Sequence, residues 1–139
     1  PYGPFDYQER LIPRVISNAL ENKDINLTNP SIGRDFIFID DVIDLYLKTI
    51  EKANEFHGEI FNVGSGIQSK ISDVINYVME ITNSKSNIFW GRYKPRDYDL
   101  KIWVADMKKT KKYFDWSPKN NLKQGLEKTI DWFRINKQI

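Results

Sequence analysis

Apolar residues recur at the spacing of an amphipathic helix in five stretches of this 139-residue chain. In the first of them the repeating positions include Leu11, Val15, Ile16 and Ala19. Helices are predicted over residues 9–21, 42–53, 71–78, 106–114 and 122–135. Each presents an apolar stripe to a core and a polar face to solvent.

Short apolar or alternating runs lie between these helices and predict strands. They cover residues 25–28, 36–39, 59–63 and 87–90, and residues 102–105 are expected to be extended. Strands that alternate with helices indicate the α/β class with some parallel pairing. We therefore expect one α/β domain, a small mixed sheet of short strands with about five helices, because the length suits a single domain.

Residues 33–42 (GRDFIFIDDV) combine a strand, a helix start and charges at both ends. The aromatic and β-branched run 36–39 predicts a buried strand. Asp40 is expected to cap the next helix, with Asp41 as a favourable charge in its first turn. Arg34, a planar and permanently charged group before the strand, suits a phosphate. The alternative is a surface arginine paired with Asp35 or Asp40.

Two further segments could hold an anion. Residues 92–99 contain three cations, two tyrosines and two carboxylates, which could neutralise a diphosphate, cover a base and accept from ribose hydroxyls. The alternative is a solvated charged loop. The turn Gly64-Ser65-Gly66 follows a predicted strand, but Ser69 stands where a phosphate-binding fingerprint requires a third glycine. A tight turn is therefore the favoured interpretation.

Composition limits the classes of function. The chain has a net charge of +2, no cysteine and one histidine, which excludes disulfides, thiol catalysis and cysteine-containing zinc sites. No apolar run of membrane-spanning length and no signal-peptide pattern is present, so we expect a cytoplasmic protein without a membrane or metal partner. A pI near 8.8 leaves room for an anionic small ligand.

The remaining features favour structural roles. Leu11 is expected in the core, His57 in a solvated loop, and Arg10 could serve either structure or binding. Most of the tryptophans (Trp90, Trp103, Trp116 and Trp132) are expected to pack in the core or against another domain. The lysines of residues 108–112 predict a solvated helix face, and they carry the only argument for nucleic-acid binding.

Taken in order, these pieces resemble the C-terminal part of the extended short-chain dehydrogenase/reductase family, the NAD-dependent nucleotide-sugar epimerases and dehydratases. The family pattern is Tyr-Gly-Pro, Ile-Pro-Arg, Arg-Asp-Phe-x-x-(Val/Ile)-Asp-Asp, Phe-Asn-x-Gly-Ser-Gly, Arg-x-x-Asp, Asp-x-x-Lys and Trp-x-Pro. The matching segments here are residues 2–4, 12–14, 34–41, 61–66, 96–99, 106–109 and 116–118. The ordered set is specific, although no single motif decides it. Residues 29–32 depart from the family's usual glycine-rich turn, which leaves the base preference open.

The resemblance implies a role for several residues. Arg34 and Arg96 would contact the diphosphate of a nucleotide sugar from opposite sides, and Asp99 would take the ribose hydroxyls. Arg10 and Leu11 would lie near the nucleotide, with residues 25–28 beside the base. Pro1 and Tyr2 would lie near the nicotinamide end of the cofactor site.

The resemblance also implies what this chain lacks. The family's N-terminal Rossmann domain, which binds NAD or NADP, has no match here, and none of the seven tyrosines is followed by a lysine four residues on. We therefore expect residues 1–139 to be a single nucleotide-sugar-binding lobe, without catalytic residues and without a cofactor of its own. Its partners would be a nucleotide-diphosphate sugar and the missing Rossmann domain, and the parent enzyme could be a homodimer. The alternative is a stand-alone nucleotide-binding or protein-interaction module without catalysis.

Overall fold

The computed structural model describes residues 1–94 and 102–136, and these residues form an α/β fold. The α-helices are α1 (Leu11–Leu20), α2 (Ile39–Glu51), α3 (Ile71–Thr82), α4 (Lys108–Phe114) and α5 (Leu122–Ile135). A 3-10 turn, η1 (Ala53–Glu55), follows α2. The strands are β1 (Ile25–Asn26), β2 (Gly33–Asp35), β3 (Gln68–Lys70) and β4 (Ile88–Phe89). The predicted class and the number of helices are confirmed.

The strands form two separate pairs, one of each kind. β1 pairs parallel with β4, and β2 pairs antiparallel with β3, with Arg34 opposite Ser69. A single parallel bridge joins Tyr2 to Phe38. Both pairs therefore join segments more than 30 residues apart in the chain. They connect distant parts of the chain and do not form a broad sheet.

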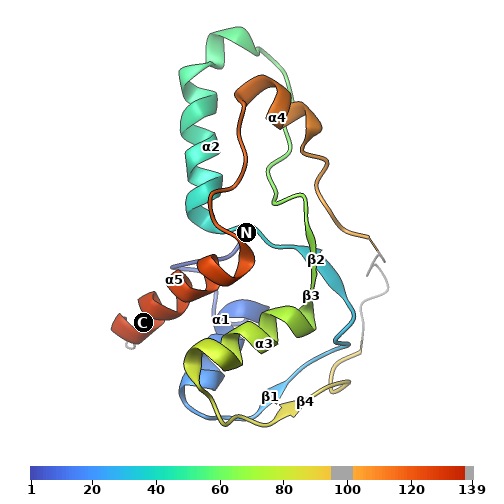
Figure 1. Cartoon of the computed structure of the whole chain (residues 1–139), viewed down its shortest axis with the longest axis vertical. Helices are drawn as coiled ribbons and strands as arrows, with labels where there is room; N and C mark the ends of the chain where they lie inside the picture. The colour runs from blue at the N-terminus through green and yellow to red at the C-terminus, as the bar shows by residue number, and fades with distance from the viewer. Residues whose placement is uncertain (95–101, 137–139) are drawn as a thin grey trace.

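Two hydrophobic clusters hold the elongated molecule together (Figure 1). The larger one lies among α1, α3 and α5, whose stripes supply fully buried residues such as Val15, Val74 and Leu126. The smaller one joins α2 to α4 through Val42, Leu45, Phe114 and Trp116. The segment that leads from β2 into α2 contributes to both clusters, so it links the two ends of the molecule.

Three local predictions from the sequence are wrong. Residues 36–39 do not form a strand: they are half-buried to buried, but the strand β2 ends before them, and α2 begins at Ile39. The helix N-cap is Phe38, without a side-chain cap, so Asp40 lies inside the first turn. Residues 59–63 are extended but unpaired, and β3 forms after the glycine turn instead. An apolar run reports burial, whereas a strand also needs a hydrogen-bonding neighbour.

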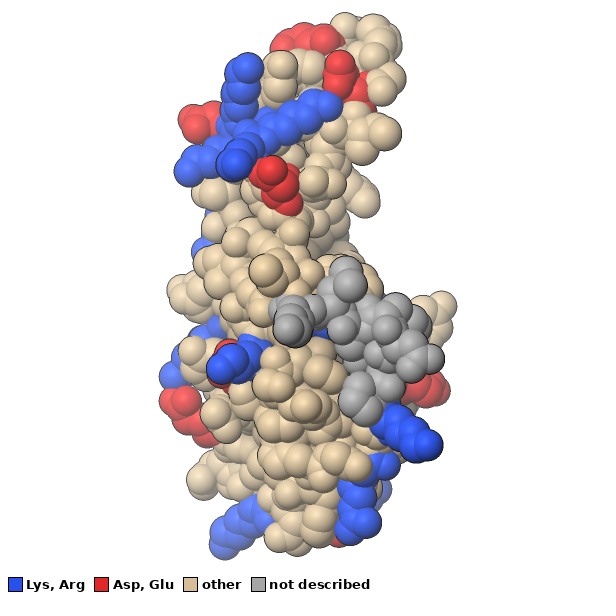
Figure 2. Space-filling model, turned by 90° about the vertical axis from the view of Figure 1, so that its right-hand side faces the viewer, with Lys and Arg blue, Asp and Glu red and all other residues tan. Residues whose placement is uncertain are grey.

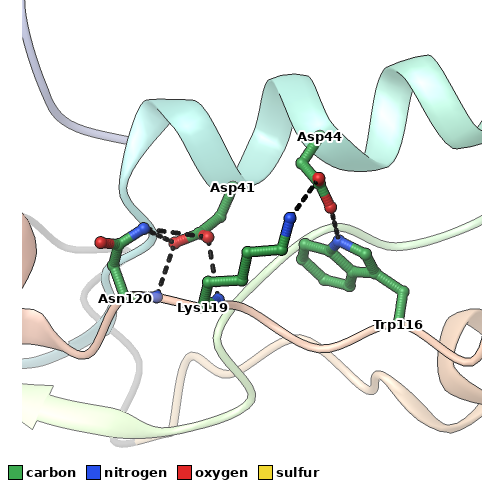
Figure 3. Close-up of polar contacts among 5 residues, drawn as sticks. All are labelled: Asp41, Asp44, Trp116, Lys119 and Asn120. Atoms are coloured by element: carbon green, nitrogen blue, oxygen red, sulfur yellow. Dashed lines mark hydrogen bonds and ion pairs between the residues drawn. The ribbon is translucent and has the colours of Figure 1, made fainter.

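The buried carboxylate of Asp41 ties the start of α2 to the loop before α5 (Figure 3). It accepts hydrogen bonds from the backbone N–H groups of Lys119 and Asn120 at 2.9 and 3.3 Å. The Asn120 side-chain amide lies 3.1 Å from both of its oxygens. A buried charge is tolerated only when donors surround it in this way. The loop must therefore stay against α2.

One turn further along α2, Asp44 binds the same loop (Figure 3). It accepts from the Trp116 indole Nε1 at 2.7 Å and from the Lys119 Nζ at 2.6 Å. These donors hold the pKa of the Asp44 carboxyl below its ordinary value of 3.8. The Trp-x-Pro segment of the sequence thus has a structural partner on α2.

We expect Asp41→Ala to lower the free energy of unfolding by about 2–3 kcal/mol, because it leaves the buried donors of Asn120 and Lys119 unpaired. The adjacent Asp40→Ala is the matched control, since Asp40 is exposed in the same first turn, and its effect should stay below about 1 kcal/mol. Urea unfolding followed by tryptophan fluorescence measures both. Equal effects would refute the assigned role of Asp41.

Candidate functional site

The carboxylate of Asp35, at the end of β2, is the hub of the candidate site. It accepts the backbone N–H groups of Ser65 at 2.7 Å and Gly66 at 3.0 Å, and the Ser65 hydroxyl at 2.5 Å. Its second oxygen also accepts the N–H of Ala105 at 3.0 Å. One side chain therefore fixes the turn at residues 64–66 and the segment before α4 against β2.

Residue 64 is a glycine because Ala105 and the Asp35 carboxylate lie too close to it for a side chain. A Cβ atom on Gly64 would lie 2.5 Å from the Ala105 Cβ and 2.7 Å from a carboxylate oxygen of Asp35. The N–H groups that could have held a phosphate are thus directed at an internal carboxylate. The tight-turn interpretation of Gly64-Ser65-Gly66 is confirmed, and this turn does not fit the phosphates of a dinucleotide.

Arg34 lies beside Asp35 on β2 with its guanidinium stacked on the Trp103 ring, 4.6 Å from the ring centroid. Its Nη1 donates to the Gly33 carbonyl at 2.7 Å. The side chain is half-buried, and the oxygens of the neighbouring Asp35 accept hydrogen bonds from the turn at residues 64–66. A stacked guanidinium loses freedom while its plane keeps the forked geometry that suits phosphate oxygens.

A shallow hollow opens where the parallel strands β1 and β4 end, which is the edge where α/β folds commonly bind ligands. It is lined by Thr28, Asn29, Pro30, Trp90, Gly91, Tyr93 and Lys94. Backbone bonds from Gly91 to Thr28 and from Arg92 to Leu27 extend the strand pairing into its floor. The Arg14 guanidinium lies 5.3 Å from the centroid of the Tyr93 ring. The hollow thus offers aromatic faces beside cations.

The other predicted site residues have diverse surroundings. Arg10 stands at the N-cap position of α1 without a side-chain cap and pairs with Asp6 at 3.0 Å, whereas Leu11 packs against the larger core cluster. Pro1 is exposed. Tyr2 is buried, and its hydroxyl donates to the Leu122 carbonyl at 3.1 Å. Burial raises the pKa of that hydroxyl, which keeps Tyr2 protonated. The predicted roles of Arg10, Leu11, Pro1 and Tyr2 remain predictions.

Arg96 and Asp99 lie outside the described residues, as does most of the charged segment 92–99. Their predicted contacts to the diphosphate and ribose therefore remain predictions. Within residues 1–94 and 102–136, no group of three acidic, histidine or cysteine side chains is arranged to hold a metal ion. In the same residues, no helix is both long and apolar enough to cross a membrane.

The sequence indicated Tyr93 as a side chain that could cover a base, but it did not single out Trp90 and Trp103. Of the four tryptophans only Trp116 is buried in the core, while Trp90 and Trp103 are 36% and 44% exposed. The sequence signal that could have singled out Trp90 is its place at the end of the predicted strand 87–90, where a rigid element positions binding residues. The lysines of α4 are exposed, as predicted, and Figure 2 shows basic side chains on the upper part of the face together with acidic ones. Lys109, for example, pairs with Glu59 at 2.6 Å.

Comparison with known proteins identifies the class. Residues 1–64 match the NAD dependent epimerase/dehydratase family. The chain is 30% identical to dTDP-D-glucose 4,6-dehydratase of Homo sapiens over 97% of its length, and 31% identical to CDP-abequose synthase of Salmonella muenchen over 93%. These alignments cover 39% and 44% of the two relatives.

Solved structures agree with this class. UDP-glucose 4-epimerase of Thermotoga maritima, solved with UDP-glucose, superimposes with a TM-score of 0.86 at 25% identity, over 99% of this chain and 44% of that one. The dTDP-glucose 4,6-dehydratase of Bacillus anthracis, solved with NAD, gives 0.86 at 28% identity, over 99% of this chain and 43% of that one.

The fold of this chain therefore matches part of the fold of these two solved enzymes. Residues 1–64 match the family model and the relatives align over nearly the whole chain, so the resemblance that the motifs indicated is confirmed. The chain spans about two fifths of the length of the curated relatives that it matches.

We expect Asp35→Asn to destabilise the chain by about 2–3 kcal/mol, because its new NH2 group would face the N–H donors that now point at a carboxylate. Asp106→Asn is the control: its remaining carbonyl oxygen can still accept from the Lys108 N–H, so its effect should be below about 1 kcal/mol. Thermal and urea unfolding measure both variants. A neutral Asp35→Asn would show that Asp35 does not hold the two segments.

Proposed function

We propose that this chain is the nucleotide-sugar-binding lobe of an NAD(P)-dependent sugar epimerase or dehydratase. The observation that carries the proposal is Arg34, a half-buried guanidinium that is stacked on an aromatic ring at the end of a clamped strand. Such a group can donate two parallel hydrogen bonds to two oxygens of a diphosphate. The relatives named above act on, or are solved with, nucleotide sugars, which supports a diphosphate as the anion.

The hollow at the ends of β1 and β4 is the proposed site for the base. Its tryptophan and tyrosine could stack on a base face, and the backbone and side-chain groups of Thr28 and Asn29 could hydrogen-bond to the base edge. Arg96 would complete the diphosphate contacts, and Asp99 would accept from the ribose. Which base and which sugar are bound depends on these contacts.

The redox chemistry would come from NAD or NADP bound to a Rossmann domain of a longer parent. This chain would bind the sugar and orient it toward that cofactor. Tyr2 is unsuited to act as a base, since burial raises its pKa and its hydroxyl donates to Leu122. We therefore propose that the chain alone turns over no nucleotide sugar.

The exposed apolar side chains of α2 favour a further domain in the parent protein over the alternative of a stand-alone module. Four large apolar side chains, at positions that share one helix face, are 49–69% exposed: Ile43, Tyr46, Leu47 and Ile50. Ile60, in the unpaired segment 59–63, is 82% exposed. A protein that functions alone would be expected to carry polar residues at such positions. We propose that the Rossmann domain of the parent covers this face.

Calorimetric titration of the chain with UDP, dTDP and CDP tests the binding role. At least one should bind, and Arg34→Ala should weaken it about 10- to 100-fold, because a charge-assisted contact is lost. Arg134→Ala is the charge-matched control, since Arg134 pairs with Asp131 on α5, and it should leave the affinity unchanged. Binding that is indifferent to Arg34, or no binding at all, would refute the proposal.

Sedimentation and hydrophobic-dye binding test the α2 face. The wild-type chain should self-associate, and Ile50→Glu should suppress both the association and the dye binding. Ile135→Glu on α5 is the matched control, because Ile135 is also an exposed isoleucine, and it should change neither. A wild-type chain that stays monomeric and binds no dye would favour the stand-alone module.

A further inference from the structure

The backbone of residues 103–105 is fixed beside β2 at alternate residues. The Ala105 N–H donates to Asp35 at 3.0 Å, and the Trp103 N–H donates to the Gln68 side-chain oxygen at 3.3 Å. Both bonds come from side chains of the β2–β3 pair rather than from a strand ladder. The segment is therefore held without belonging to a sheet.

Gln68 reaches Trp103 because Gly33, which pairs with Lys70 in the β2–β3 ladder, has no side chain. A Cβ atom on Gly33 would lie 2.5–2.7 Å from three atoms of the Gln68 side chain. The Gln68 side chain thus crosses over Gly33. This arrangement sets the position of the Trp103 backbone relative to the neighbouring Arg34.

The indole of Trp103 packs on the face of the Arg34 guanidinium, 4.6 Å from the ring centroid. Trp103 is 44% exposed, and among residues 1–94 and 102–136 it belongs to neither hydrophobic cluster. A ring on one face of the guanidinium restricts its rotation out of its own plane. The N–H donors lie in that plane, so the ring leaves them accessible. The order imposed on Arg34 exists before any ligand arrives.

We propose that Trp103 is the positioning residue for Arg34: it preorganises the guanidinium for the diphosphate of the nucleotide sugar. This inference rests on the proposed function, because it assigns the diphosphate to Arg34. Preorganisation raises affinity by removing the entropic cost of ordering a long side chain upon binding. Trp103 itself need not touch the ligand.

The ordering of Arg34 can be measured on the ligand-free chain. We expect the 15N relaxation order parameter of the Arg34 Nε–H to fall below ~0.6 in Trp103→Leu, the range of flexible groups, and to keep its wild-type value in Trp103→Phe. Rescue by phenylalanine separates stacking from a general packing role. An order parameter that is the same in the wild type and Trp103→Leu would overturn the inference.

Titration with UDP and dTDP completes the test. Trp103→Leu should weaken binding about 3- to 30-fold, and Trp103→Phe by less than about twofold. The control Trp132→Leu, which removes an indole that packs on Phe5, should leave the affinity unchanged. If Arg34→Ala weakens binding but Trp103→Leu does not, the inference fails and the proposed function stands. If the wild type binds neither nucleotide, both fail.

Discussion

The Asp35 carboxylate is the interaction on which the rest of the site depends. It lies at the end of the short strand β2 and gathers three backbone N–H groups and one hydroxyl from two other segments. A carboxylate in this setting has to be surrounded by donors, so the turn at residues 64–66 and the segment at Ala105 are drawn to it. Arg34, one residue before it, is thereby placed between the same segments.

Asp41, six positions later, is a second carboxylate that accepts hydrogen bonds from a distant segment. It holds the loop at Lys119 and Asn120 against α2. The two carboxylates together hold three distant parts of the chain, at residues 64–66, 105 and 119–120, against one stretch of ten residues. This explains why the family resemblance lies in an ordered series of short motifs: several of them are partners in these contacts. The Arg-Asp-Phe and Asp-Asp motifs provide the acceptors, and the Gly-Ser-Gly motif and the segment after Trp-x-Pro provide donors.

The sequence predicted the helices well because their apolar periodicity reports directly on the face that is buried. The last helix was placed over its observed residues, and the solvated lysine face of α4 was predicted correctly. The strands were harder to predict from the sequence. A strand at residues 36–39 was inferred from their apolar character, whereas the observed ladder runs through the charged residues Arg34 and Asp35. Pairing partners lie about 35 residues apart, and local pattern carries no information about them.

In the candidate site, too, some residues could be predicted from the sequence and others could not. Arg34 was singled out by its charge and its place beside a strand, and the resemblance assigned it a ligand. Trp103 was grouped with the other tryptophans as core or domain-packing residues, because the four are too scattered to form an aromatic binding stripe. Only the three-dimensional contacts through Gln68 and Asp35 show that its ring lies on Arg34. Arg96 and Asp99 still rest on the sequence alone.

The most direct measurement is a crystal structure of this chain with dTDP-glucose or UDP-glucose. The account predicts the diphosphate against the Arg34 guanidinium, the base in the hollow beyond β1 and β4, and the Trp103 ring still stacked on the arginine. A nucleotide sugar bound elsewhere, with its diphosphate away from Arg34, would contradict the assignment of this lobe's binding site.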